Sequence, residues 1–191
     1  MNDLAFYFKE GWQHIISLDA LDHQLFIIAL VAIYTLKDWK KILVLVTAFT
    51  IGHSITLALS VYDVLRVNSA WVEFLISCTI VITAGFNFFQ KNISQKKIKL
   101  NYIFALFFGL IHGLGFANTL RFMLAKDQTI GMSLFCFNIG LELGQILIVS
   151  IILLLSYFII SIVKVSQAYW VYFLSSITFI WAVKFALERI P

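Results

Sequence analysis

The chain has 191 residues, of which 61% are hydrophobic and only 13% are charged. A soluble domain of this size carries about twice that share of charged residues and could not bury so much apolar surface. The composition therefore excludes a soluble enzyme, a nucleic-acid-binding module and a disordered tail. It predicts an integral membrane protein that forms a single domain over residues 1–191. We expect the lipid bilayer to be its principal partner, and no nucleic acid to be one.

Six apolar segments approach or exceed the roughly 20 residues that a helix needs to cross a bilayer. In chain order, we expect spans at 18–36, 42–62, 69–90, 100–124, 132–163 and 168–187. The preceding segment, 1–17, contains Trp12 and is expected to lie flat at the outer membrane interface. The long runs lack the alternation of a membrane barrel. The predicted fold class is therefore all-α, a polytopic membrane bundle of about six transmembrane helices.

Basic residues in the predicted loops orient this bundle. The first, third and fifth loops carry Lys37, Lys40, Lys41, Lys91, Lys96, Lys97, Lys99 and Lys164, whereas the second and fourth carry Arg66, Arg121 and Lys126. Because cytoplasmic loops are enriched in lysine and arginine, the first set is expected in the cytoplasm. Both termini are then expected outside.

Glycines are concentrated in the fourth and fifth predicted spans. Gly109 and Gly113 are four residues apart, and so are Gly140 and Gly144. This spacing favours close helix packing in membranes. The alternative is a locally loosened helix that exposes carbonyl groups to a cavity, as in many transporters.

Ionisable and polar side chains inside the spans are the most informative feature, because burying them in a membrane is costly and they are functional candidates by default. Residues three or four apart share a helix face, so each of several spans has one polar stripe. These stripes contain Asp19, Asp22 and His23; Thr50 and His53, with Ser54 beside them; Glu73; and Asn138, Glu142 and Gln145. His112 lies in the fourth span. We therefore expect a shared polar cavity inside the bundle.

Imidazoles and carboxylates without cysteine or methionine favour a divalent ion such as nickel, cobalt, zinc or iron over copper(I). A carboxylate next to a ligating histidine can also orient its ring, which is a role open to Asp22 beside His23. Other interpretations remain for some residues. Glu73 is equally compatible with a surface glutamate near a helix end, and Asn138 and Gln145 with hydrogen bonds that join helices.

Several motifs in fixed order resemble the HupE/UreJ family of small bacterial membrane proteins. They comprise Gly11 with His14-Ile15, Asp22-His23 with Leu25-Phe26, the segments 47–57 (TAFTIGHSITL), 108–117 (FGLIHGLGFA) and 137–145 (FNIGLELGQ), and Val72-Glu73. The resemblance implies a multi-pass protein of the bacterial cytoplasmic (inner) membrane that acts as a secondary permease for nickel, with cobalt as a further cargo. By matching position, it implies the metal ligands His14, His23, His53 and His112, with Asp22 and Glu142 beside them.

The leading hypothesis is a secondary transporter for a divalent transition-metal ion, with nickel as the first candidate, rather than an enzyme. Asp19, Thr50, Ser54, Glu73, Asn138 and Gln145 are then expected around the ligands or along the ion pathway. The alternative is an intramembrane zinc-dependent hydrolase, in which Glu142 or Asp22 is the general base; the lack of a His-Glu-x-x-His pair weighs against it. A purely structural protein is a third hypothesis. Assembly into a homo-oligomer stays open.

Overall fold

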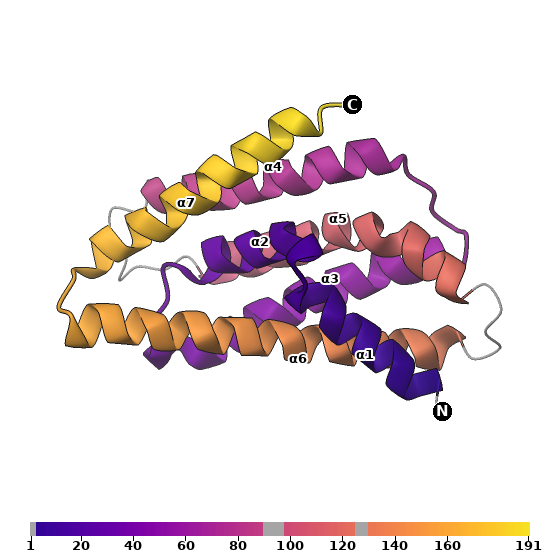
Figure 1. The fold of residues 1–191 in the computed structure, drawn as a ribbon, viewed down its shortest axis with the longest axis horizontal. Coiled ribbons are helices and arrows are strands. Elements are labelled where there is room, and N and C mark those ends of the chain that lie inside the picture. The colour runs from indigo at the N-terminus through magenta and orange to yellow at the C-terminus, as the bar shows by residue number, and fades with distance from the viewer. Residues whose placement is uncertain (1–2, 90–97, 125–129) are drawn as a thin grey trace.

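The computed structural model describes residues 3–89, 98–124 and 130–191, and this part of the chain is helical without strands (Figure 1). The predicted all-α fold is confirmed. The helices are α1 Asp3–Ile16, α2 Leu21–Val31, α3 Trp39–Val61, α4 Ser69–Phe88, α5 Ile98–Leu124, α6 Ile130–Tyr157 and α7 Gln167–Glu188. Short helical turns lie at Leu18–Ala20 and Leu36–Asp38, and a π-helical turn at Phe158–Ile162 extends α6.

Five helices, α3 to α7, are each long and apolar enough to cross a membrane. They correspond to the last five predicted spans; Gln90, Lys91, Lys96, Lys97 and Lys126 lie outside the described residues. The first span differs from the prediction 18–36. Helix α2 has only 11 residues and ends at Val31, which is too short to cross alone. Together with α1 it forms a pair bent by 58°, and this pair counts as a sixth crossing if the two helices make one broken span.

Helix α1 packs along α6 with very little space between the two backbones. A Cβ on Gly11 would collide with the carbonyl of Phe137, and a Cβ on Gly140 with the carbonyl of Phe8. Gly144 is covered in the same way by the side chain of Ile15. The position of residues 1–17 relative to the bilayer stays a prediction, but this packing favours a place among the spans over a flat one at the interface.

Helices α3 and α5 form the second close pair. Gly52 lies against the backbone of α5, while Gly109 and Gly113 lie against the carbonyls of Phe49 and His53. The expected role of the Gly109/Gly113 and Gly140/Gly144 spacings in close packing is therefore confirmed. Both α5 and α6 run without interruption through these glycines, so the break in the bundle falls between α1 and α2 instead.

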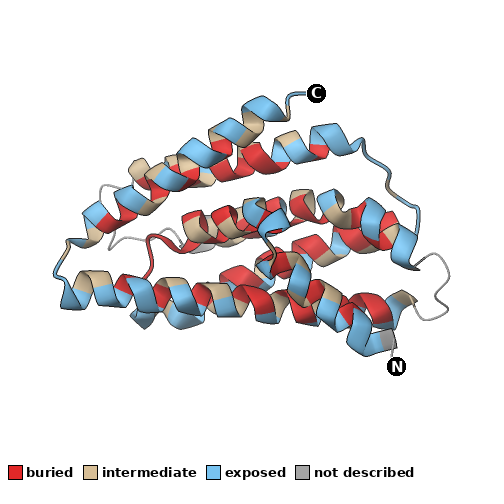
Figure 2. Cartoon of the chain, in the orientation of Figure 1, coloured by how far each residue is buried: buried red, intermediate tan, exposed pale blue. Residues whose placement is uncertain are grey.

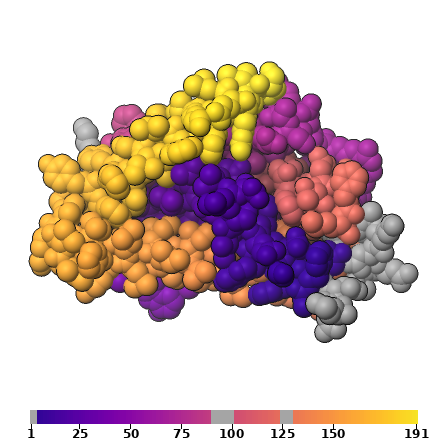
Figure 3. Space-filling view, in the orientation of Figure 1, coloured from indigo at the N-terminus to yellow at the C-terminus, as the bar shows by residue number. Residues whose placement is uncertain are grey.

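The bundle is arranged in three tiers (Figure 1). Helices α4 and α7 pair on one side, α1 and α6 pair on the other, and α2, α3 and α5 lie between them. Buried residues face the middle of this arrangement, and exposed ones cover its outer helix faces (Figure 2). In the space-filling view, α2 lies between α7 and α6, and α1 lies across α6 (Figures 1 and 3). Helix α1 begins and α7 ends in the same half of the molecule, as an even number of crossings requires; that this is the outer side stays a prediction.

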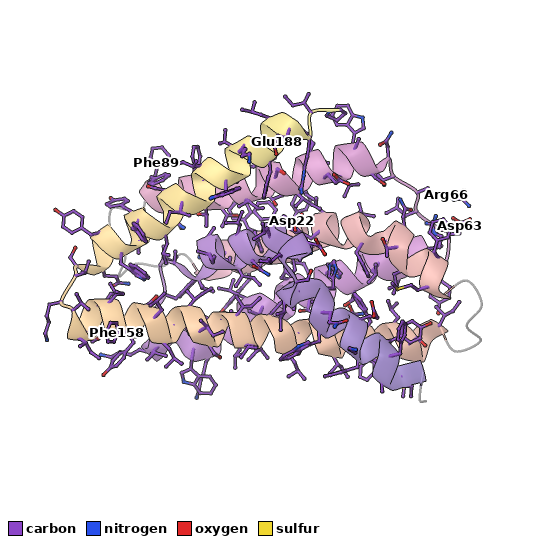
Figure 4. All side chains as sticks on the ribbon, viewed as in Figure 1. Asp22, Asp63, Arg66, Phe89, Phe158 and Glu188 are labelled. Atoms are coloured by element: carbon purple, nitrogen blue, oxygen red, sulfur yellow. The ribbon has the colours of Figure 1, made fainter. Side chains whose placement is uncertain are left out.

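The loop between α3 and α4 is held to the end of α5. Arg121 on α5 donates hydrogen bonds to the carbonyl of Ser60, near the end of α3, and lies 3.7 Å from Asp63. Asp63 adopts a positive φ of 62°, which an aspartate tolerates better than most residues. The hydrogen bonds from Arg66 lower the pKa of the Asp63 carboxyl. Figure 4 shows Asp63 and Arg66 together at this end of the bundle.

Candidate metal centre

Four helices bring the four histidines of the chain together. His14 comes from α1, His23 from α2, His53 from α3 and His112 from α5. The ring centroids of His23 lie 4.9 Å from those of His14, 5.9 Å from His53 and 5.0 Å from His112. We call these four residues the histidine group. It joins the bent pair α1–α2 to the close pair α3–α5.

Three members of the histidine group approach the geometry of a metal site. His14, His23 and His53 each offer a ring nitrogen, and these nitrogens lie within 4.8 Å of one another. An ion with ligand bonds of about 2 Å requires nitrogens no more than about 4 Å apart. Small ring rotations would therefore bring all three into contact with a single ion.

Hydrogen bonds fix the rings of His23 and His112 so that one nitrogen of each faces the group with a free lone pair. The Nδ1–H of His112 donates to the carbonyl of Phe108 over 2.8 Å, because a carbonyl can only accept. The Nδ1–H of His23 donates to Asp22 Oδ1 over 2.9 Å. When these rings are neutral, Nε2 is the unprotonated nitrogen of each. A carboxylate or carbonyl behind the ring is the usual support of a metal-ligating histidine.

Buried nitrogens without a partner are the strongest sign that this group binds something. Within the described residues, the Nε2 atoms of all four histidines and the Nδ1 of His53 are buried without a hydrogen-bond partner. His53 and His112 are completely buried, and His23 is 4% exposed. Each unsatisfied buried polar atom costs about 1–3 kcal/mol. A ligand at the histidine group would supply partners for these five nitrogens.

Aromatic rings surround the group and keep it dry. Phe49 and Phe26 lie 5.1 Å from the ring of His112, and Phe116 lies 4.1 Å from that of His14. These side chains exclude water and offer no competing ligand, so charges at the group are only weakly screened.

The break between α1 and α2 is stabilised by Gln24, which the sequence analysis did not single out. Its Nε2 donates towards the carbonyls of Ile15, Ile16 and Ser17, at 3.2, 3.0 and 2.9 Å. Ile15 and Ile16 are the last residues of α1, where carbonyls lack partners within the helix, and the Ser17 carbonyl also accepts from the backbone N–H of Ala20. Gln24 therefore fixes the angle at which the helices carrying His14 and His23 meet. The signal that could have found Gln24 in the sequence was its amide side chain directly after Asp22-His23, in the first turn of a predicted helix.

An open cavity of about 760 Å³ reaches the histidine group from the surface. Its wall includes His14 and the predicted pathway residue Asp19, and its other lining residues are Lys9, Glu10, Trp12, Gln13, Ile16, Ser17, Phe116 and Met123. Polar and charged side chains thus stand beside apolar ones in the wall of a cavity that touches His14, whose Nε2 is itself buried. Asp19 belongs to this wall and not to the histidine group.

Asp22 supports the group from behind and does not point a free oxygen into it. One carboxylate oxygen bonds to His23, and the other lies 3.3 Å from the Nη1 of Arg189. The Nε of Arg189 also lies 3.9 Å from Glu73 Oε2. Glu73 is thus joined to the site through an ion pair. The sequence analysis missed Arg189. The signal that could have found it was an arginine near the end of the last span, together with two carboxylates, Asp22 and Glu73, for which the sequence offered no obvious partner.

Among the described residues, Glu142 lies outside the cluster of possible ligand atoms that His14, His23 and His53 form. Its Oε1 accepts a hydrogen bond from Thr47 on α3 over 2.6 Å. One turn along, Thr50 donates to Gln145 over 2.9 Å, and Ser54 donates to the carbonyl of Thr50. The Ser54 bond lies within α3, whereas the bonds of Thr47 and Thr50 join α3 to α6, in agreement with the interpretation of Gln145 as a residue that joins helices. The Oδ1 of Asn138 is buried without a partner among the described residues.

Comparison with family models finds one match over residues 1–189, described as HupE / UreJ protein. No curated protein and no solved structure matches the chain.

Proposed function

This chain belongs to the HupE/UreJ family, and we propose that it is a secondary permease for a divalent transition-metal ion, with nickel as its first candidate cargo. The family is associated with nickel and metal transport. The convergence of unpartnered imidazole nitrogens from four helices carries the proposal. Nitrogen ligands without sulfur suit nickel, cobalt or zinc. We further propose that the protein works in the bacterial cytoplasmic membrane.

The ligands that we propose are His14, His23, His53 and His112. Asp22 supports His23 through its Nδ1–H, as a carboxylate behind a ligand does in other metal sites. Glu142 is better explained as a partner of Thr47 than as a ligand. Neutral imidazole ligands do not offset the positive charge of the ion. The nearest negative charge in the proposed site is the carboxylate of Asp22, behind His23.

The route that we propose begins in the open cavity. A hydrated ion would enter past Asp19 and Glu10, which attract a cation, and meet His14 first. It would exchange water for the nitrogens of the histidine group. Thr50 lies one turn from His53 towards the start of α3, and Thr47 lies one turn further. These hydroxyls, with Gln145 and Glu142 beside them, offer oxygen contacts on the way to the other side. Transport requires such moderate, successive binding.

The test is nickel uptake into proteoliposomes that contain the purified full chain. We expect His53→Ala and His112→Ala to abolish uptake, because each removes a nitrogen of the site. Thr178→Val, which alters a buried hydroxyl on α7 away from the group, should leave uptake near the wild-type rate. Uptake that is unchanged in both histidine variants would overturn the proposal.

A zinc-dependent hydrolase is the second candidate, and the approach of three imidazoles favours it, because three histidines are a common catalytic zinc set. Against it, both Asp22 oxygens are already engaged, one with His23 and one with Arg189, so within the described part of the chain Asp22 is not free to act as the general base. Metal analysis of the purified protein separates the two functions. A zinc ion that resists exchange with added nickel would favour the hydrolase, and a readily exchanged ion the permease.

A further inference from the structure

Arg189 connects α7 to the back of the histidine group. It follows the last residue of α7, and its guanidinium lies 3.3 Å from Asp22 and 3.9 Å from Glu73. The same group lies 4.9 Å from the ring centroid of Phe185, one turn earlier. Figure 4 shows Asp22 on the side of α2 that faces α7 and α4. Three helices are therefore joined by one cation.

The ion pair places a permanent positive charge one side chain away from a ring of the group. Asp22 uses Oδ1 for the ring and the backbone N–H of His23, at 2.9 and 2.8 Å, and Oδ2 for Arg189. An arginine side chain stays protonated in proteins. A divalent ion at the Nε2 of His23 and the guanidinium would therefore compete for the same carboxylate, in surroundings where charges are poorly screened.

We propose that Arg189 is a positioning residue that lowers the affinity of the histidine group for divalent cations, acting through Asp22. This proposal rests on the proposed function, because it takes the histidine group to be the ion site. The guanidinium keeps Asp22 as a support for His23 and weakens the field that the carboxylate exerts on the ion. Glu73, on the far side of the guanidinium, partly neutralises it and so moderates its effect.

The physical benefit is release. Four imidazoles in a dry pocket would hold a transition-metal ion too firmly for transport, and a nearby fixed cation weakens that hold. The coupling is reciprocal: a bound ion should also loosen the pairing of Arg189 with Asp22, and with it the contact of α7 with α2. The histidine group and the end of α7 would thus be energetically linked.

The experiment is a titration of the purified full chain with Ni²⁺ and with Zn²⁺ by calorimetry in detergent. Arg189→Gln should bind either ion more tightly, by on the order of tenfold, and Arg189→Lys, which keeps the charge, should stay closer to the wild type. Glu73→Gln should bind more weakly, because the guanidinium then acts without compensation. Glu73 has a half-exposed side chain, so this variant is expected to fold and tests the proposal even if Arg189→Gln does not.

Lys184→Gln is the matched control. Lys184 pairs with Glu188 at 3.7 Å on the same last turns of α7, and both side chains are exposed. Its removal changes the net charge by the same amount and should leave the affinity unchanged. In an Asp22→Asn background, Arg189→Gln should lose most of its effect, since the coupling runs through that carboxylate.

The outcomes separate two failures. Unchanged or weaker binding in Arg189→Gln, or tighter binding in Glu73→Gln, would overturn this inference, because a merely structural role predicts weaker binding in both variants. If the wild type and His53→Ala bind the ions equally, the histidine group is not the ion site and the proposed function itself fails.

Discussion

Replacing His53 with leucine should stabilise the ion-free protein while abolishing its response to metal. Both ring nitrogens of His53 are buried without a partner in the described part of the chain, and the side chain is fully covered. At about 1–3 kcal/mol for each unsatisfied buried group, a leucine of similar size removes a considerable penalty. Allowing for imperfect packing of the new side chain, we expect a net gain of about 1–3 kcal/mol.

The second half of the prediction concerns ligand stabilisation. An ion that binds the folded wild type at 100 times its Kd raises the free energy of unfolding by about 2.7 kcal/mol. In His53→Leu this increment should disappear, because the variant lacks a central ligand. The two effects have opposite signs, so a general loss of structure cannot imitate the result.

The assay is thermal unfolding of the purified protein in detergent, with and without added Ni²⁺. For a chain of this length, each kcal/mol shifts Tm by about 2–4 °C. The control is Thr178→Val, which removes a buried hydroxyl that already donates to the carbonyl of Leu174 and should therefore give no gain. A His53→Leu protein that is less stable without metal, or that still gains stability from Ni²⁺, would refute the reasoning.

Three further predictions follow from the packing and from the supports of the site. Gly109→Ala should lower the stability by about 1–3 kcal/mol or more, because the new Cβ would collide with the backbone of Phe49. In the control Gly85→Ala, the new Cβ meets its nearest atom at 3.8 Å, and the stability should rise by up to about 1 kcal/mol. Thermal unfolding compares the two variants, and equal effects would contradict the close contact of α3 with α5. Gln24→Leu should cost about 1–3 kcal/mol in the same assay and weaken Ni²⁺ binding, since the carbonyls of Ile15 and Ile16 at the end of α1 lose the amide donor. Full retention of stability and of Ni²⁺ binding would show that the bend does not depend on Gln24. Asp22→Asn should weaken Ni²⁺ binding about 10- to 100-fold in calorimetric titration, and unchanged affinity would exclude the carboxylate as a support.

Much of the bundle could be predicted because membrane insertion is governed by local composition. A run of apolar residues long enough to cross hydrocarbon must be helical, since every backbone group has to be satisfied within the segment. That rule located α3 to α7, and the four-residue spacing of Gly109/Gly113 and Gly140/Gly144 predicted close helix contacts. The rule was wrong about the extent of the first span, where the chain compensates for a break with a side-chain amide from Gln24.

The candidate site was predictable in its residue types and less so in its geometry. His23, His53 and His112 stand in predicted spans and His14 in the segment before them, and the structure brings all four together. Helical spacing along α6 could not tell whether Glu142 faces the histidines or α3, because that depends on how α6 is rotated against its neighbours. Thr47 accounts for Glu142 instead, and the three-dimensional fold makes this choice.

The sequence by itself determined the all-helical membrane character, the approximate spans and the identity of the ionisable residues, because each of these follows from local hydropathy and spacing. Only the tertiary structure decided which of them meet: that α1 joins the bundle through glycine contacts, that Asp22 lies behind His23, and that Arg189, 167 positions further along the chain, pairs with Asp22. Such contacts depend on how helices rotate and tilt against one another. Local sequence does not determine that rotation, because it is set by the packing of each helix against its neighbours.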